Sequence, residues 1–326
     1  MSDSRNLLEV GHLTKIFNTG GFIAKRELVA VDDVSFNIPA EKPTILTIAG
    51  ESGSGKTTTA RMVLGFIGPT HGEVIYRGKN ILSMGKDEWK KYRREVQAIF
   101  QDPFGAFNPM YVVDHALKVP IEKYNLTETD DEARRLISET LEVVGLRPEE
   151  ILGKHPHQLS GGQRQRIMLA RAFLLRPRIV VADEPVSMLD ASMRAGILHV
   201  MLDLKKMWNV SFLYITHDLS TAHYISDSIA IMYQGSIAEM GPIDDVIENP
   251  LHPYSRLLID SIPIPDPGQR WKEHIELPSR ESQTQTLKGC KFYDRCGLRM
   301  EVCKAERPML RQEGSTSVAC HLYRAS

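Results

Sequence analysis

The sequence predicts an α/β fold in which a largely parallel sheet is covered by helices on both faces. Three observations support this prediction: short apolar runs, helical stretches that alternate with them, and a glycine-rich loop between one such run and a helix. Short, nearly unbroken apolar runs are typical of strands buried on both faces, and parallel strands need crossover connections that are usually helices. The 326 residues suffice for one large domain with an appendage, or for two domains.

The N-terminal part of the chain supplies two predicted strands and a helix. Residues 28–38, LVAVDDVSFNI, alternate as in a half-buried strand, whereas residues 44–49, TILTIA, predict a buried central strand. The glycine-rich loop follows directly, and residues 56–66 then have helix-compatible composition until Gly68 and Pro69 end the helix. Strand, loop and helix stand in the order that a phosphate site requires.

The middle of the chain is predicted to be helical between residues 110 and 165. Within it, residues 129–146 begin with a capping box formed by Thr129 and Glu132 and carry an apolar stripe on one face. The stripe consists of Ala133, Leu136, Ile137, Leu141 and Val144. Two further buried strands are predicted at residues 178–183, RIVVAD, and 211–216, SFLYIT.

A change of amino-acid composition near Ser261 predicts a domain boundary. Residues 261–271, SIPIPDPGQRW, form a proline-rich linker, and the polar segment beyond them holds all four cysteines. The sequence therefore predicts a main domain of residues 1–260 and an extension of residues 261–326 (the extension).

Charge and hydropathy limit how the chain can meet nucleic acid or a membrane. The 40 basic and 41 acidic residues give a net charge of −1, so we expect no global attraction to nucleic acid or to an anionic membrane. The N-terminal segment lacks a basic stretch followed by an apolar core, and no later stretch approaches the roughly 18 apolar residues of a spanning helix. We expect a cytosolic chain that spans no membrane.

The stretch GESGSGKTT, residues 50–58 (the phosphate loop), carries the chemistry of a nucleotide site. Gly50, Gly55, Lys56 and Thr57 meet the pattern G-x-x-x-x-G-K-[ST]. Glycines let successive N–H groups turn toward phosphate oxygens, the following helix adds partial positive charge, and Lys56 adds a full charge. The hydroxyl of Thr57 would bind Mg²⁺. The loop's other expected nucleotide contacts are Ser52, Gly53, Ser54 and Thr58.

The acidic strand end IVVADEP is the natural partner of such a loop. Asp183 can hold Mg²⁺ through a water, and Glu184 can orient the water that attacks the terminal phosphate. Acidic pairs at strand ends are often solvated caps, so the assignment depends on the phosphate loop.

Residues 159–185, LSGGQRQRIMLARAFLLRPRIVVADEP, join a second glycine motif to the acidic strand, and here the sequence resembles the ATP-binding cassette (ABC) family. The resemblance covers about residues 5–262. It implies a P-loop ATPase core with a mixed sheet and helices on both faces, a helical subdomain at about residues 102–175, and a small cysteine-containing extension.

Ser160, Gly161, Gly162 and Gln163 (the signature motif) open a helix and so form a second anion site at a helix N-terminus. One ATP cannot use both sites. The resemblance implies that two cassettes pack head to tail, with the signature motif of one closing over the γ-phosphate held by the other. A purely structural S-x-x-Q capping box is the competing interpretation.

The resemblance implies further site residues. Gln101, after the strand-like VQAIF, matches the glutamine that contacts Mg²⁺ and senses the γ-phosphate, and His217, after FLYIT, matches the switch histidine. With Lys56, Thr57, Asp183 and Glu184 they make the chain an expected active ATPase.

Two other positions also match the family. Asp190 matches the loop that bridges two cassettes, although Met188 stands where a small residue is more usual. Phe17 resembles the aromatic residue that stacks on adenine, with Phe22 as its competitor and a core role possible for either.

Two segments resemble those of peptide importer ATPases. The first is residues 100–113, FQDPFGAFNPMYVV. The resemblance places Phe104, Phe107 and Pro109 of this segment near a groove that receives a permease helix. The alternative is that the aromatic residues belong to the core. Residues 249–263, NPLHPYSRLLIDSIP, resemble the C-terminal motif of oligopeptide and dipeptide transporter ATPases. The cargo of that subfamily includes peptides, nickel chelates and, in some members, oligosaccharides.

The resemblance also implies an assembly. We expect a second, different ATPase subunit, two permease subunits and an extracytoplasmic solute-binding protein, with this chain peripheral at the cytoplasmic face of the membrane and no nucleic acid bound. The alternatives are a non-transport ABC ATPase that acts on DNA or ribosomes, and an exporter. ABC ATPases that act on DNA carry an inserted coiled coil, and those that act on ribosomes carry a second cassette. Exporters usually have a fused membrane domain. The sequence shows none of these features.

Cys290, Cys296, Cys303 and Cys320 form the pattern C-x5-C-x6-C-x16-C. A reducing compartment argues against disulfides, and four thiolates suit Zn²⁺ or an iron–sulfur cluster. The close cysteine pair that is usual for zinc is absent, and the tail resembles the extension of peptide importer ATPases in which a [4Fe–4S] cluster has been recognised. The cluster is therefore expected, with zinc and unliganded thiols as alternatives and His321 as a spare ligand.

Overall fold

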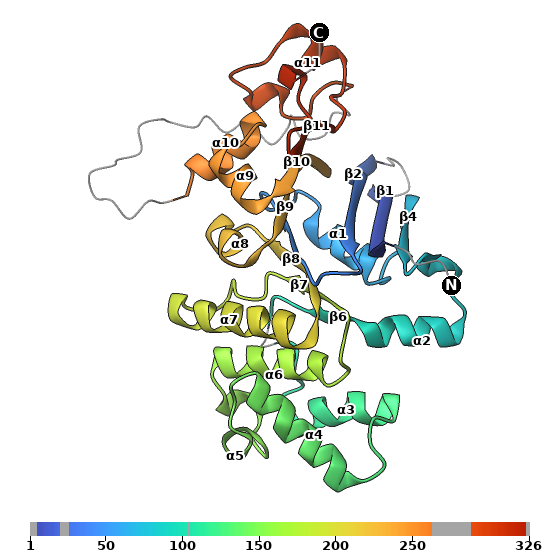
Figure 1. Ribbon diagram of the computed structural model, residues 1–326, viewed down its shortest axis with the longest axis vertical. Coiled ribbons are helices and arrows are strands. Elements are labelled where there is room, and N and C mark those ends of the chain that lie inside the picture. The colour runs from blue at the N-terminus through green and yellow to red at the C-terminus, as the bar shows by residue number, and fades with distance from the viewer. Residues whose placement is uncertain (1–4, 20–25, 103–104, 263–287, 324–326) are drawn as a thin grey trace, which may run out of the picture.

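Two sheets organise the chain, as the computed structural model in Figure 1 shows for residues 5–19, 26–102, 105–262 and 288–323. One sheet has eight strands in the order β11-β12-β10-β9-β3-β8-β7-β6, and the other has four in the order β2-β1-β4-β5. The strands are β1 (Asn6–Thr19), β2 (Arg26–Pro39), β3 (Ile45–Ala49), β4 (His71–Tyr76), β5 (Lys79–Asn80), β6 (Val96–Ile99), β7 (Ile179–Asp183), β8 (Ser211–Thr216), β9 (Ser228–Tyr233), β10 (Ser236–Pro242), β11 (Arg311–Glu313) and β12 (Thr316–Val318).

Five neighbouring strands of the larger sheet, β6, β7, β8, β3 and β9, run parallel, and β10, β12 and β11 continue it antiparallel. The predicted strands at residues 44–49, 178–183 and 211–216 are therefore confirmed as β3, β7 and β8. All five residues of β3 are buried, as expected of a central strand.

The helices cover both faces of this sheet. They are α1 (Lys56–Val63), α2 (Lys86–Glu95), α3 (Val113–Tyr124), α4 (Asp130–Val143), α5 (Pro148–Ile151), α6 (Gly161–Phe173), α7 (Ala191–Trp208), α8 (Leu219–Ile225), α9 (Ile243–Glu248), α10 (Pro253–Asp260) and α11 (Glu301–Ala305). Alternation along β8 shows the two faces: Phe212 and Tyr214 belong to the core of the α3–α7 side, whereas Leu213 and Ile215 belong to the core on the side of α1. The predicted fold class is confirmed.

The helical region matches the predicted pattern closely. Thr129 accepts a hydrogen bond from the backbone N–H of Glu132 at 3.2 Å, and Glu132 accepts one from the N–H of Thr129 at 3.3 Å, which completes the capping box. Ile137, Leu141 and Val144 of the predicted apolar stripe are fully buried. Ala133 and Leu136 pack against the same core while partly exposed.

The four-stranded antiparallel sheet was not predicted in full, since the sequence pattern indicates β2 but neither β1 nor β4. The pairing of β1 with β2 shifts register at several points, among them Val10/Leu13 and Leu13/Lys15. Such irregularities interrupt the two-residue alternation by which strands are recognised in a sequence.

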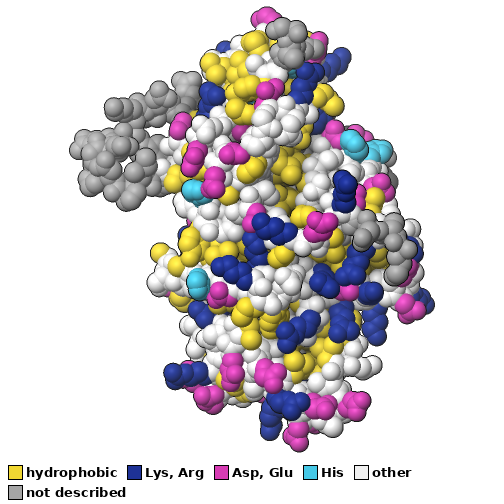
Figure 2. All heavy atoms as spheres, in the orientation of Figure 1, with side chains coloured by type: hydrophobic (Ala, Val, Ile, Leu, Met, Phe, Trp, Pro, Cys, Tyr) yellow, Lys and Arg dark blue, Asp and Glu magenta, His cyan; other side chains and the backbone are white. Residues whose placement is uncertain are grey.

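The extension returns to the main sheet. Its strand β12 pairs with β10, with Glu239 opposite Val318, and Phe292 is buried against α10 and β9. The proline-rich residues 263–271 of the predicted linker lie outside the described residues. Figure 2 shows hydrophobic side chains among the charged ones at this end of the molecule.

None of the helices in the described part of the chain is both long and apolar enough to cross a membrane.

Candidate functional site

The phosphate loop connects β3 to α1 and has the conformation that its glycines allow. Gly50 has φ 148°, and a Cβ there would lie 2.1 Å from the carbonyl oxygen of Met232. Gly55 has φ 101° and caps α1. A larger residue at Gly50 would meet the neighbouring strand β9, so the glycine is needed for close packing as well as for the turn.

The side chain of Lys56 is buried inside the phosphate loop. Its Nζ donates hydrogen bonds to the carbonyl oxygens of Gly50 at 2.7 Å and Glu51 at 2.8 Å. Burial lowers the pKa of the ammonium, and nearby carboxylates act in the opposite direction. The positive charge is thus held at the centre of the loop.

Thr57 and Asp183 meet across two elements, as a shared metal site requires. The Thr57 hydroxyl donates to Oδ1 of Asp183 at 3.2 Å. Burial raises the pKa of the Asp183 carboxyl, while this hydrogen bond opposes the rise. Their oxygens are the ligand type that Mg²⁺ prefers, so the pair fits a magnesium ion held beside the phosphate loop.

Glu184 contacts the other two expected catalytic residues, Gln101 and His217. Its Oε2 accepts a hydrogen bond from Nε2 of Gln101 at 3.2 Å, and its Oε1 lies 2.9 Å from Nδ1 of His217. Glu184 has φ 48°, a left-handed conformation that costs a non-glycine residue of order 1–3 kcal/mol and is common at functional sites.

The strand order explains this meeting. Gln101 follows β6, Glu184 follows β7 and His217 follows β8, and these three strands are consecutive neighbours in the sheet. Because they run parallel, their carboxyl ends lie at one edge, where ligands of open α/β sheets bind.

The remaining expected nucleotide contacts vary in exposure. Ser52 and Gly53 are exposed at the loop surface, Thr58 is half-buried, and Ser54 is buried with its carbonyl bonded to the N–H of Gly235 at 2.9 Å. Phe17 on β1 is half-buried, with the Lys15 ammonium 5.3 Å from its ring centroid. Its competitor Phe22 lies outside the described residues.

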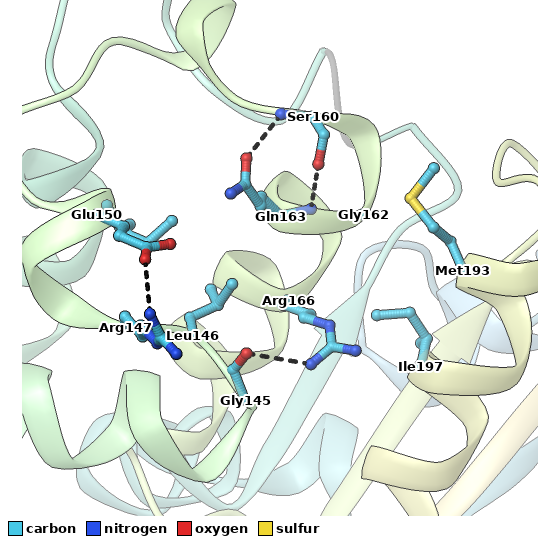
Figure 3. Close-up of a pocket in the computed structure, with 11 residues that line it drawn as sticks. Gly145, Leu146, Arg147, Glu150, Ser160, Gly162, Gln163, Arg166, Met193 and Ile197 are labelled. Atoms are coloured by element: carbon cyan, nitrogen blue, oxygen red, sulfur yellow. Dashed lines mark hydrogen bonds and ion pairs between the residues drawn. The ribbon is translucent and has the colours of Figure 1, made fainter.

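The signature motif opens α6 and forms the capping box. The Ser160 hydroxyl accepts from the N–H of Gln163 at 3.2 Å, and the Gln163 side chain accepts from the N–H of Ser160 at 2.9 Å. Figure 3 shows both bonds at the rim of a cavity of about 330 Å³ that Gly162 and Arg166 also line. The capping box is therefore present, and it leaves Ser160 exposed at a helix N-terminus, while the role of the motif as an anion site stays a prediction.

The signature motif and the phosphate loop of one chain do not meet. Figure 1 draws α1 and α6 in separate parts of the molecule, and among the described residues no hydrogen bond or ion pair joins residues 160–163 to residues 50–58. The phosphate loop and the signature motif of one chain therefore lie at separate places on the molecule.

Asp190 stands at the start of α7, the helix that packs against α6. It caps α7 by accepting from the N–H of Met193 at 3.0 Å, and this bond lowers the pKa of its carboxyl. Met193 packs against α6, where a Cβ on Gly162 would lie 2.5 Å from its Sδ. Met188, the unusual residue of this loop, is half exposed.

The segment expected near a permease groove divides between core and surface. Phe107 is 6% exposed and belongs to the hydrophobic core, which supports the core interpretation for this residue. Pro109 is exposed, and Met110 beside it is 80% exposed. Phe104 lies outside the described residues.

The four cysteines lie together in the extension as free thiols. Burial, with smaller contributions from the other three thiols, raises the pKa of Cys290 to about 11. Nevertheless, within the described residues no three or more His, Cys, Asp or Glu side chains are arranged to hold a metal ion. His321 bonds the carbonyl of Glu306 at 2.9 Å. The donor chemistry suits a metal centre, but the thiols are not preformed as a ligand set.

Three residues at the phosphate loop were missed by the sequence analysis. Glu51 of the loop binds Arg295 of the extension through two hydrogen bonds of 2.9 Å, and its backbone N–H donates to the Tyr254 hydroxyl at 3.0 Å. Tyr254 stands in the motif HPYSRLL, which indicated a subfamily but no contact. No local signal links Arg295 to a loop 244 residues away.

The phosphate loop, the Thr57–Asp183 pair and the Gln101–Glu184–His217 group, on a sheet of this topology, define a P-loop ATPase of the cassette class. The family described as ABC transporter matches residues 31–187, and that described as oligopeptide/dipeptide transporter, C-terminal region, matches residues 238–303. The second match spans the predicted boundary at residue 261, which stays a prediction.

Curated relatives agree with this class. The Bacillus subtilis putative oligopeptide transport ATP-binding protein YkfD is 41% identical over 321 residues, 98% of this chain and 96% of the relative. The Escherichia coli oligopeptide transport ATP-binding protein OppF is 37% identical over 297 residues, 90% of this chain and 88% of the relative. The chain belongs to the family of oligopeptide and dipeptide ABC transporter ATP-binding proteins.

A solved structure supports the fold. The dimeric post-hydrolysis state of the ATP-binding cassette MJ0796, bound to ADP and Pi, has a TM-score of 0.64 and 27% identity, and covers 72% of this chain and 98% of that chain. The resemblance to the ABC family and the prediction of an ABC-type ATPase are confirmed.

Proposed function

We propose that this chain is the ATP-hydrolysing subunit of a peptide importer and drives the movement of separate permease subunits. The observation that carries the proposal is the contact of Glu184 with both Gln101 and His217, next to the Thr57–Asp183 pair. These five side chains lie on or just after four elements, α1, β6, β7 and β8, and the proposed mechanism gives each of them a role.

Each residue has a proposed role. Lys56 and the loop N–H groups bind the phosphates, and Phe17 stacks on the adenine. Thr57, Gln101 and Asp183 would hold Mg²⁺, which when bound neutralises phosphate charge. Glu184 accepts a hydrogen bond from the attacking water and orients it, while His217 donates to the γ-phosphate.

The active unit is proposed to be a pair of cassettes. Ser160–Gln163 of one subunit would close over the γ-phosphate held by the phosphate loop of the other, with Asp190 bridging the two sites. The separation of these two half-sites within one chain supports this arrangement. Shifting such an equilibrium from 1:99 to 99:1 requires about 5.5 kcal/mol of differential binding, which ATP held between two subunits can supply.

The wider assembly is proposed from the family. Two permease subunits, a second and different ATPase subunit and an extracytoplasmic solute-binding protein complete the importer, with this chain peripheral at the cytoplasmic face of the membrane. The relatives named for oligopeptide transport support peptides as cargo, with oligosaccharides as the competitor. The near-balanced charge gives no support to the nucleic-acid or ribosome alternative.

The assembly and cargo can be tested together. The tagged chain, extracted gently from native membranes, is expected to bring two permeases, a second cassette and a binding protein. After reconstitution in liposomes, oligopeptides presented with that binding protein should stimulate ATP hydrolysis, and oligosaccharides should not. If the chain is instead recovered with ribosomes or DNA and without membrane proteins, the importer hypothesis is wrong, although the assignment as an ATPase is unaffected.

For the extension we propose that Cys290, Cys296, Cys303 and Cys320 hold a [4Fe–4S] cluster. Four free thiols within one small module support the proposal, because cysteine sulfurs are the ligands of such clusters. Burial raises the pKa of Cys290, Cys296 and Cys320, so cluster binding must also displace their protons. Binding would require the four side chains to converge further, since they are not preformed as a ligand set.

Anaerobic purification is expected to give a brown protein with broad visible absorption and about four iron atoms and four sulfides per chain. Cys296→Ser should lower the iron content, whereas Ser315→Ala, in the turn between β11 and β12, should not. About one zinc per chain without visible absorption would establish the zinc alternative, and four reactive thiols without metal would establish unliganded cysteines.

A further inference from the structure

Arg295, in the extension, contacts the phosphate loop. The two terminal nitrogens of its guanidinium donate to the two carboxylate oxygens of Glu51, both at 2.9 Å. The Arg295 side chain is 11% exposed and that of Glu51 43%. A bidentate pair of this kind fixes direction as well as distance, because the planar fork of arginine matches the carboxylate.

Arg295 is itself held in place by aromatic side chains. Its guanidinium carbon lies 5.7 Å from the ring centroid of Tyr233 and 5.6 Å from that of Phe292. Phe292 is buried and packs on Tyr254, with ring centroids 5.5 Å apart. The cation therefore rests on a rigid support and cannot swing away from the loop without losing these contacts.

Glu51 is restrained at every polar group. Its N–H donates to the Tyr254 hydroxyl at 3.0 Å, its carbonyl accepts from Lys56 at 2.8 Å, and its carboxylate binds Arg295. Two of these partners lie outside the phosphate loop. They fix one peptide of a glycine-rich loop whose backbone would otherwise be ordered at an entropic cost when the nucleotide binds.

We propose that Arg295 is a positioning residue for ATP: acting through Glu51, it holds the phosphate loop in its binding conformation and so raises nucleotide affinity. The inference deepens the proposed ATPase function and rests on it. The residue takes no part in the chemical step, so its effect belongs in KM rather than in kcat.

Another arginine of the same module provides a matched control. Arg307 pairs with Asp32 at 2.8 Å and donates to the Ser236 hydroxyl at 2.9 Å, so it ties the extension to β2 and β10 without contacting the phosphate loop. Its loss would loosen the docking of the extension. Comparison with Arg307 separates positioning of the loop from general docking.

The test measures KM for ATP and kcat on the reconstituted transporter for Arg295→Gln, Glu51→Gln, their double variant and Arg307→Gln. Arg295→Gln and Glu51→Gln are each expected to raise KM about threefold to tenfold, with kcat within about twofold, as for loss of one partly exposed charged pair. The double variant should be no worse than either single one, and Arg295→Lys should restore part of the affinity. Arg307→Gln should leave KM unchanged.

Three outcomes would overturn the proposal: an unchanged KM in Arg295→Gln, an effect in the double variant equal to the product of the single effects, or an equal rise in Arg307→Gln. Equilibrium binding of a fluorescent ATP analogue to the same variants separates this inference from the proposed function. If the wild-type protein does not hydrolyse ATP, the proposed function fails, and the binding constants still decide the role of Arg295.

Discussion

Replacing Glu184 with glutamine is expected to lower the steady-state rate of ATP hydrolysis at least about 100-fold while ATP binding persists. The amide keeps the size of the side chain and can still contact Gln101 and His217. It cannot accept a proton from water, and it exchanges one acceptor oxygen for a donor. The loss therefore falls on the chemical step, and ATP should accumulate unhydrolysed at the site.

Single-turnover hydrolysis and nucleotide binding on the reconstituted complex check this result. Glu41→Gln makes the same change at an exposed position between β2 and β3 and should retain full activity. A Glu184→Gln protein that hydrolyses ATP at the wild-type rate would remove Glu184 from its assigned role, and another group would then have to orient the water.

Lys56→Met is expected to weaken ATP binding at least about 100-fold, because the site loses its one full positive charge inside the phosphate loop. Methionine preserves the packing of the buried stem. The carbonyls of Gly50 and Glu51 lose their shared donor, so a modest fall in stability should accompany the loss of affinity.

Binding of a fluorescent ATP analogue measures this change, and thermal unfolding shows that the fold is kept. Lys91→Met, on the exposed side of α2, is the matched control and should bind ATP normally. Lys56 and Glu184 thereby separate the two functions of the site: the first variant should fail at binding, and the second should bind and fail at chemistry. Tight binding by Lys56→Met would contradict the assignment.

Features built from consecutive residues were predictable from the sequence. The phosphate loop, the signature motif and the capping box of α4 are each defined by a few neighbouring residues whose backbone groups and side chains satisfy one another locally. The strands β3, β7 and β8 were likewise predictable, because their burial on both faces makes them continuous apolar runs. The antiparallel sheet was not predictable in the same way, because the register shifts of β1 interrupt the alternation of apolar and polar residues.

The contacts between distant residues depend on how the whole chain packs. Gln101 and Glu184 are 83 positions apart and His217 and Glu184 are 33 apart, yet they contact one another because β6, β7 and β8 are neighbours in the sheet. The Arg295–Glu51 pair spans 244 positions and depends on the return of the extension, whose strand β12 pairs with β10. Hydrophobic patterning specifies that a strand is buried, but the partner beside it is chosen by the packing of the whole chain, and that packing places the extension against the phosphate loop.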